Sequence, residues 1–403
     1  MATQQPEVII AGGSLGGLST ALFLRDIGCK VTVLERSAET LIGRGAGIVL
    51  SPYTVRYFTE KGSEQLAAFS QMSVVSKTLR YMDSDGQIVS ETPVPYRFSS
   101  YNAIYKPLLV AFGMDDYHLS AEMVNFEQKG DRVRVHLADG RQLSADMLVC
   151  ADGVRSTGRR LLMPEVEFQY AGYVAWRGIL DEDELPKDVF DMFSDTILYH
   201  IMPDSHLLVY PIPVVDRDPE AGVKPYINWL WYRNIPEGEA LDNLMVDRKG
   251  RQRSVSLGPG AVQQTHIDAM RADGANILPG PLLTLVNNTK EPFIQAVMDA
   301  EVDQMVFGRV CIMGDGAFAA RPHAAAGTAK ATEDGWQLAV ALKETGGDVP
   351  KALELWNERQ VKMGQGILER SREAGRRFQV EGTWKVGDPL PFGLYEIGDS
   401  EMA

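Results

Sequence analysis

Cysteine is scarce in this chain of 403 residues, and the three present, Cys29, Cys150 and Cys311, lie far apart. Their spacing matches no zinc site, and an odd number cannot all pair in intramolecular disulfides. Because each lies in or beside an apolar run, we expect buried, reduced thiols. The histidines show no ligand spacing either, so no metal site is expected.

The chain also lacks a long hydrophobic run and an excess of basic residues. The first apolar run, 8–11, is too short to span a membrane, and no basic region precedes it as in a secretion signal. The net charge of −14 disfavours nucleic acid and anionic membrane as partners. We therefore expect a cytoplasmic protein with no nucleic-acid and no membrane partner.

What the sequence does contain is the pattern of an α/β protein long enough for two packed domains. Residues 8–11 and 30–35 predict buried parallel strands, and residues 18–26 between them predict a helix. Strand, glycine turn, helix and strand together make a βαβ unit, which is right-handed almost without exception.

The α/β pattern is then interrupted. Alternating segments predict hairpins at 74–95 and 131–143, and residues 170–231 are rich in aromatic and β-branched residues. A buried strand returns only at 309–314, with a helix expected after it over 327–342. An α/β domain is thus begun, interrupted by a β-rich insert and completed near the C-terminus.

A glycine-rich turn joins the first strand to the first helix, with the sequence Gly12-Gly13-Ser14-Leu15-Gly16-Gly17. Gly12 permits the tight turn, Gly17 lets helix and strand approach, and the helix N-terminus offers N–H groups to a diphosphate. Ser14 replaces the usual middle glycine, although its hydroxyl could itself donate to a phosphate. Glu35, at the end of the second strand, is placed to accept hydrogen bonds from an adenosine ribose. These residues alone do not distinguish an NAD-binding from an FAD-binding protein.

Two later segments carry a resemblance to a known family. Residues 145–159 contain Ala-Asp-Gly around Asp152, and residues 308–317 contain Gly-Asp around Asp315. In this order after the glycine turn, they resemble the motifs of group A FAD-dependent aromatic hydroxylases, the p-hydroxybenzoate hydroxylase type. The likeness covers the whole chain, and it is greatest to the members that hydroxylate dihydroxypyridines.

The resemblance implies a Rossmann-like FAD-binding domain, an inserted mixed β-sheet substrate domain and a C-terminal helix. The expected ranges are 1–75, 102–165 and 291–345 for the FAD-binding domain, 76–101 and 166–290 for the substrate domain, and 346–403 for the C-terminal helix and tail.

The resemblance also implies roles for residues at a non-covalently bound FAD. Asp315 would bind the ribityl hydroxyls, and Asp152 would serve both flavin and nicotinamide. Gly45, Ala46 and Gly47 would line the flavin ring, where small residues allow close backbone approach. Gly327 would open a helix whose N-terminus stabilises negative charge on the reduced flavin.

One departure from the family pattern concerns the FAD phosphates. The family commonly has an arginine near position 101, where this chain has Tyr101. Phosphate neutralisation is therefore left to Arg36 or to backbone N–H groups.

By resemblance, the activity is hydroxylation of a small electron-rich aromatic or N-heteroaromatic ring, hydroxypyridine- or phenol-like, by a flavin C4a-hydroperoxide formed with O2. NADH or NADPH would be a transient reductant, since no second glycine fingerprint of equal quality exists. A homodimer is possible. Alternatives on the same fold are an epoxidase, a decarboxylative hydroxylase or a flavin reductase of isoprenoid chains. A non-catalytic flavin or NAD sensor is a further alternative.

The expected catalytic residues lie in two segments. His323, after Pro322 in the loop expected at the flavin, could act as the base that ionises a substrate hydroxyl, or could only shape the loop through a backbone hydrogen bond. Arg321 could hold an anionic substrate or the flavin, or form an ion pair. Tyr210, like Tyr173, could line the pocket or be a structural aromatic of a sheet face.

Overall fold

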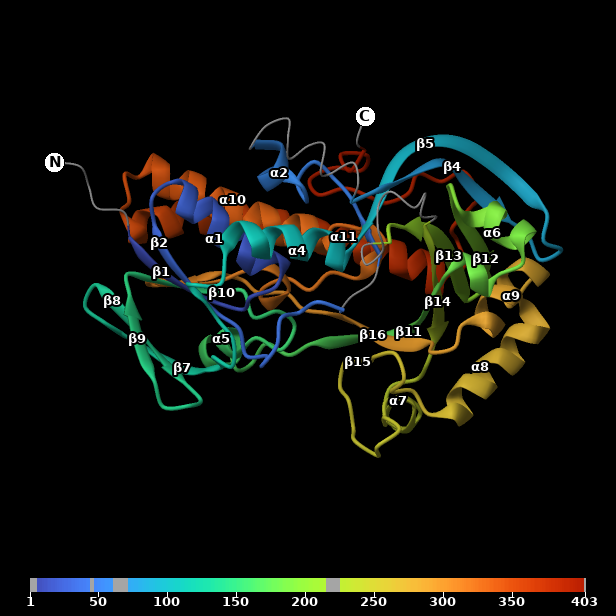
Figure 1. Ribbon diagram of the computed structural model, residues 1–403, viewed down its shortest axis with the longest axis horizontal. Helices are drawn as coiled ribbons and strands as arrows, with labels where there is room; N and C mark the ends of the chain where they lie inside the picture. The colour runs from blue at the N-terminus through green and yellow to red at the C-terminus, as the bar shows by residue number, and fades with distance from the viewer. Residues whose placement is uncertain (1–5, 44–46, 61–71, 215–224, 402–403) are drawn as a thin grey trace.

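A six-stranded sheet forms the first half of the computed structural model, which describes residues 6–43, 47–60, 72–214 and 225–401 (Figure 1). Its strand order is β17-β18-β10-β1-β2-β6. The bounds are β1 (Glu7–Ala11), β2 (Lys30–Leu34), β6 (Tyr117–His118), β10 (Met147–Cys150), β17 (Val306–Phe307) and β18 (Val310–Ile312). β1 runs parallel to both β2 and β10, which confirms the expected βαβ unit.

Helices and a small sheet cover the two faces of this first sheet. On one face lie α1 (Leu15–Asp26), α4 (Tyr101–Phe112) and α10 (Gly327–Glu344). On the other lie α5 (Thr157–Leu162) and a three-stranded sheet of β7 (Met123–Lys129), β8 (Arg132–Leu137) and β9 (Gln142–Ala145). The β8–β9 hairpin is the one expected at 131–143. The short helix α2 (Arg56–Glu60) lies near α1.

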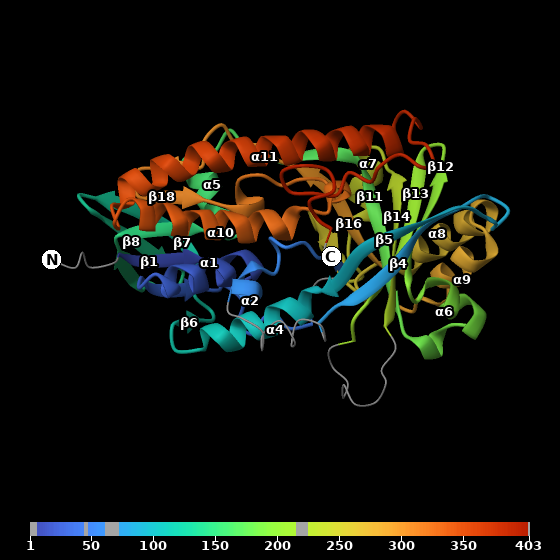
Figure 2. The same ribbon diagram turned by 90° about the horizontal axis from the view of Figure 1, so that it is seen from above.

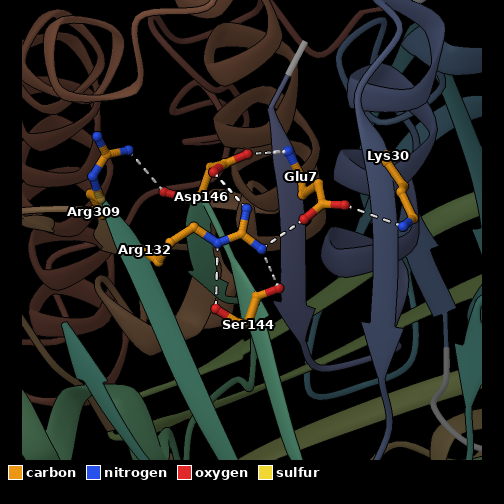
Figure 3. Close-up of polar contacts among 6 residues, drawn as sticks. All are labelled: Glu7, Lys30, Arg132, Ser144, Asp146 and Arg309. Carbon is orange, nitrogen blue, oxygen red and sulfur yellow. Dashed lines mark hydrogen bonds and ion pairs between the residues drawn. The ribbon is translucent and has the colours of Figure 1, made fainter. Parts of the chain in front are cut away.

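Arg132 of β8 connects the three-stranded sheet to the first sheet (Figure 3). Its guanidinium donates to Glu7 of β1 at 2.7 Å and to Asp146, just before β10, at 2.8 Å. Glu7 also pairs with Lys30 of β2, and hydrogen bonding from Arg132 lowers the pKa of Glu7. This network lies at the amino ends of the strands, opposite the carboxyl ends where ligands of such sheets bind.

A nine-stranded sheet forms the second half, in the order β15-β16-β11-β14-β13-β12-β4-β5-β3. The bounds are β3 (Gly47–Val49), β4 (Val74–Met82), β5 (Ile88–Ser100), β11 (Gln169–Leu180), β12 (Thr196–Met202), β13 (Ser205–Ile212), β14 (Tyr226–Asn234), β15 (Ser256–Leu257) and β16 (Phe293–Asp299). The β4–β5 hairpin is the one expected at 74–95. β3 and β16 belong to this sheet, although the expected ranges placed them in the FAD-binding domain; the remaining boundaries stay a prediction.

Alternating side chains give this sheet two different faces, as the period of a strand requires. Trp229 and Trp231 of β14 are fully buried on the face that packs against helices. Leu230 and Tyr232 belong to the cluster on the opposite face. The helices of this half are α6 (Lys187–Phe193), α7 (Glu239–Leu244), α8 (Gln264–Ile277) and α9 (Gly280–Asn288).

The helix α11 (Val349–Gln379) runs along the molecule and contacts elements of both halves (Figure 2). The segment after it has no regular structure but packs closely on α11. Trp384 stacks on Phe378 with ring centroids 4.1 Å apart, and Arg370 donates to the carbonyl oxygens of Gly393 and Leu394.

The three cysteines are buried and free, as expected. Over the described part of the chain, no helix is both long and apolar enough to cross a membrane.

Candidate active site

The glycine turn after β1 has a conformation that other residues could not adopt. Gly12 has φ 109°, and a Cβ there would lie 2.2 Å from the carbonyl oxygen of Ala151. A Cβ on Gly17 would lie 1.9 Å from the Gly12 carbonyl oxygen. The turn therefore lies against β10 and leads directly into α1 at Leu15, three residues before the expected helix start.

Glu35 holds this turn in place. Its carboxylate accepts hydrogen bonds from the backbone N–H of Gly13 at 3.0 Å and of Ser37 at 2.8 Å. It lines a cavity of about 280 Å³, the loop cavity, together with Gly12, Ser14 and Arg36. Glu35 thus faces the space expected for the adenosine, while both of its oxygens also bind the chain.

Asp152 and two arginines border the same cavity. Oδ2 of Asp152 accepts from the N–H groups of Thr157 and Gly158 at the start of α5. Its Oδ1 is buried and has no partner among the described residues. Arg155 also lines the cavity, and the proximity of Arg36, more than burial, lowers the pKa of Arg155. A bound anion would relieve this repulsion between two cations.

Asp315 lies deeper, after β18, and faces a second and a third cavity. Burial raises the pKa of Asp315, and Lys330 acts in the opposite direction. The loop that carries it is fixed from α10, because Asp334 accepts from the Gly314 N–H at 2.8 Å and from Lys330 at 2.7 Å. Lys330 and Asp334 are 1 % and 0 % exposed, a buried ion pair directly below the loop.

The three cavities adjoin one another, because they share lining residues. The middle cavity, about 240 Å³, shares Ser14 and Tyr101 with the loop cavity. It shares Asp315, Gly327 and Thr328 with the sheet cavity, of about 270 Å³. The row of adjoining cavities therefore extends from Glu35, past the glycine turn and Asp315, to the nine-stranded sheet.

The sheet cavity is bounded by the face of the nine-stranded sheet opposite its helices. Side chains two residues apart on one strand point into it, such as His206, Leu208 and Tyr210 of β13. Tyr210 also contacts Gly47 of β3, where a Cβ would lie 2.4 Å from the tyrosine ring. Gly47 is thus required for the close approach of β3 to this wall, whereas Gly45 and Ala46 lie outside the described residues.

His323 and Pro322 lie in a 3-10 turn, Pro322–Ala324, at the end of the sheet cavity. His323 is 6 % exposed, and its Nε2 lies 2.7 Å from the hydroxyl of Tyr173. Burial, and secondly the charge of Arg321, lowers the pKa of His323 to about 3. The imidazole is therefore neutral at physiological pH and only weakly basic.

Arg321 lines the sheet cavity but is already paired. It donates to Asp299 at 2.8 Å, and Asp299, 1 % exposed, also accepts from Arg372 of α11 at 2.8 Å. Of the two roles weighed for Arg321, the ion pair is present.

Comparison with known proteins agrees with this geometry. Residues 5–223 match the family model described as FAD binding domain, and residues 170–299 match a model described as FAD binding domain-like. The chain is 37% identical over 404 residues to 2,6-dihydroxypyridine 3-monooxygenase of Paenarthrobacter nicotinovorans, covering 100% of this chain and 99% of that one. The chain belongs to the FAD-dependent aromatic hydroxylase family.

A second curated relative and two solved structures are also similar to this flavoprotein. It is 26% identical over 395 residues to 3-hydroxybenzoate 6-hydroxylase of Polaromonas naphthalenivorans, covering 94% and 90% of the two chains. The solved structure of 2,6-dihydroxypyridine-3-hydroxylase from Arthrobacter nicotinovorans superimposes with a TM-score of 0.91 at 37% identity over 98% of both chains. Klebsiella pneumoniae HpxO complexed with FAD and uric acid shares the fold, with a TM-score of 0.75 at 20% identity over 94% and 90%.

The residues of this flavoprotein fit FAD. The row of adjoining cavities begins with a glycine cradle at Gly12, a carboxylate oxygen of Asp152 without a partner among the described residues, and the two arginines of the loop cavity. At its inner end α10 begins at Gly327 with no side-chain cap, so its free N–H groups and positive dipole can stabilise an anion. Glu35, Ser14 and Asp315 would hold the ribose, diphosphate and ribityl parts of the cofactor.

Several residues of this flavoprotein's site were not singled out by sequence reasoning. Arg155 at the loop cavity, and Arg177, His206, Tyr232 and Phe392 at the sheet cavity, are the main ones. The period-2 pattern of β13 could have found His206, because it lies four residues before Tyr210 on the same face. Phe392 gave no such signal, since it lies in an irregular segment.

Proposed function

We propose that this flavoprotein hydroxylates a small hydroxypyridine- or phenol-like ring, using NADH or NADPH and O2. The proposal rests on the sheet cavity. Its lining combines aromatic side chains with polar groups, which belong to Arg177, His206, Tyr210 and His323. It adjoins the space for FAD at Asp315. The 37% identity to an enzyme of 2,6-dihydroxypyridine supports the substrate class.

The chain's own contribution is to bind and orient the ring and to exclude water. Tyr199, Tyr232, Phe378 and Phe392 line the cavity with apolar surface, and all four are buried. Bound FAD supplies the redox chemistry, accepting hydride from the nicotinamide and activating O2. Exclusion of water matters because it protects reactive species from side reactions.

We further propose that His323, Tyr210 and Arg321 act on the substrate side, with Pro322 shaping the turn. His323 and Tyr210 line the sheet cavity from opposite elements, a loop and a strand. Burial raises the pKa of Tyr210, so its hydroxyl stays protonated and can donate a hydrogen bond. Because Arg321 is paired with Asp299, its proposed role is to orient the loop.

A homodimer and a cytoplasmic location also remain proposals. The buried free cysteines are consistent with a reducing compartment. Light scattering on the purified protein and cell fractionation would test the two.

The decisive experiment is a screen of hydroxylated pyridines, benzoates and phenols for stimulated NADH and NADPH oxidation. We expect a hydroxypyridine to stimulate oxidation and its product to contain one oxygen atom from 18O2. A product without label would indicate a reductase. Absence of stimulation by every compound, with FAD bound, would favour a flavin sensor instead.

A further inference from the structure

Three side chains from different parts of the chain meet at one glycine of α11. A Cβ placed on Gly375 would lie 2.5 Å from the Tyr173 hydroxyl, 3.1 Å from Arg321 Nη1 and 3.2 Å from His323 Cδ2. Tyr173 comes from β11, whereas Arg321 and His323 come from the turn after β18. Only a residue without a side chain allows α11 to cover this group so closely.

The direction of the hydrogen bonds within this group is set by Arg321. Asp299 fixes the guanidinium, accepting from its Nε at 2.8 Å. The guanidinium lies beside Tyr173: its Cζ is 5.9 Å from the ring centroid, and its Nη1 and the phenol oxygen approach the same point at Gly375. Because the guanidinium is a cation without an acceptor, it favours the orientation in which the Tyr173 oxygen faces it and the hydroxyl hydrogen points away.

Tyr173 keeps its own proton and can donate it in only one direction. Burial raises the pKa of Tyr173 well above physiological pH, and the opposing effect of Arg321 is smaller. With the Tyr173 oxygen oriented toward Arg321, the hydroxyl hydrogen is directed to the partner 2.7 Å away, Nε2 of His323. A neutral imidazole that accepts at Nε2 carries its proton on Nδ1.

From this geometry we infer that Tyr173 and Arg321 are positioning residues that lock His323 as the Nδ1–H tautomer, a hydrogen-bond donor toward the sheet cavity. His323 lines that cavity, and its Nδ1 makes no hydrogen bond to any described residue. A series of side-chain contacts thus leads from the buried carboxylate to the substrate space, through Asp299, Arg321, Tyr173 and His323. Because Tyr173 donates to Nε2 of His323, this nitrogen can accept a proton only if the hydrogen bond from Tyr173 is broken.

A specificity follows, which rests on the proposed function. A donor at this place favours a ring that presents an oxygen acceptor, either an ionised hydroxyl or a ring carbonyl. Hydroxypyridines provide such an oxygen. The ring would bind with its oxygen already lacking a proton, and His323 would stabilise that oxygen instead of removing a proton from it.

The tautomer can be measured directly by long-range 1H–15N NMR on the FAD-loaded protein, with His323→Asn to assign the signals. We expect the protonated-nitrogen shift on Nδ1 and the unprotonated shift on Nε2. Tyr173→Phe removes the donor to Nε2 and should convert the signals toward the Nε2–H form. Tyr170→Phe is the matched control, because its hydroxyl lies on the same strand and donates to the Ile235 carbonyl; it should leave the His323 signals unchanged.

An Nε2–H tautomer in the wild-type protein would overturn the inference, and so would an unchanged tautomer in Tyr173→Phe. As a second measurement, 2,6-dihydroxypyridine binding is followed by flavin absorbance. Tyr173→Phe should weaken it about 2–10-fold, the effect of one neutral hydrogen bond, with FAD binding unchanged. If the wild type binds no hydroxypyridine while Nδ1 is protonated, the proposed substrate class fails and the tautomer assignment stands.

Discussion

Ser14 Oγ and the Tyr101 hydroxyl lie 2.8 Å apart across the junction of the loop and middle cavities. These are two of the positions at which the chain departs from the family pattern, serine for a glycine and tyrosine for an arginine. The hydrogen bond shows that the departures are structurally coupled. Together they present two hydroxyls to the expected diphosphate in place of a bare glycine and a cation.

Tyr101→Phe should therefore lower FAD affinity. The variant removes one neutral hydrogen-bonding group, which is worth about 0.5–1.5 kcal/mol. Titration of the apoprotein with FAD, followed by flavin fluorescence, measures the change. Tyr105→Phe is the control: Tyr105 stacks on Tyr101, but its hydroxyl bonds to Tyr117 and to the Leu41 N–H and not to Ser14. The variant should therefore lower stability more than FAD affinity. Equal effects of both would show that Tyr101 acts through packing.

Glu35→Ala should lower the free energy of unfolding of the protein even without FAD. The carboxylate accepts two backbone N–H groups, and a buried donor left unsatisfied costs about 1–3 kcal/mol. Urea unfolding of the apoprotein should show this loss, and FAD titration should show a further loss of affinity. An apoprotein as stable as the wild type would contradict the structural half of this role.

Asp315→Ala should reduce FAD retention by about 1–3 kcal/mol, the value of one or two hydrogen bonds. Its carboxylate faces the cavity, and the loop that carries it is held by Asp334. The fold should therefore survive the change. The measurement is FAD released on gel filtration at low protein concentration. Normal retention would mean that Asp315 does not contact the cofactor.

Lys330→Met should be strongly destabilising, because it leaves Asp334 buried without its counter-ion. Removing one partner of such a pair costs about 3–5 kcal/mol. Lys187→Met is the matched control, since Lys187 and Asp191 form an exposed pair with the same i,i+4 spacing; it should have little effect. Thermal unfolding of both variants compares them, and similar melting temperatures would refute the argument.

Stability should fall in mild acid because three histidines are buried and neutral. Burial lowers the pKa of His200, His206 and His323, to about 3 for His323. Above about pH 6.5 neither folded nor unfolded chain binds these protons, so they contribute nothing. Below it only the unfolded chain binds them at His206 and His323, and each of these two sites then costs about 1.4 kcal/mol per pH unit, while His200 acts in the same direction.

His323→Asn should therefore make the stability profile less steep. Urea unfolding between about pH 7 and pH 5.5 measures how steeply the free energy of unfolding falls with pH. This slope should correspond to one fewer proton taken up on unfolding than in the wild type. The comparison uses slopes because the variant also loses the Tyr173 contact. An unchanged slope would mean that His323 is protonated in the folded protein.

The cofactor half of the site was predictable from sequence because its determinants are local. Gly12 and Gly17 are required by contacts within one βαβ unit, and Glu35 ends the next strand. A turn that only glycine can adopt, and an acidic residue at the end of the next strand, can both be recognised in a single sequence.

The substrate half was less predictable because its determinants are tertiary. His206 shares a strand face with Tyr210, but nothing local in the sequence shows that this face lines a cavity. The same limit applies beside the cofactor, where Lys330 and Asp334 have the spacing of an ordinary surface ion pair. The packing of α10 against α1, α11 and the turn after β18 buries them. Phe392 lies in a segment expected to be a tail, and it reaches the cavity because Arg370 binds the backbone beside it.

The interleaved chain order has a consequence for how the protein folds. In the first sheet, Ile9 pairs with Leu148, and Leu148 pairs in turn with Val310. Such distant pairings make chain closure slow, since loop entropy is lost before the contacts form. During synthesis the glycine turn emerges early, yet Asp315 and α10 emerge only after the whole β-rich insert. FAD can therefore bind only late in synthesis. Until then, the incomplete first sheet leaves unpaired strand edges exposed in the nascent chain.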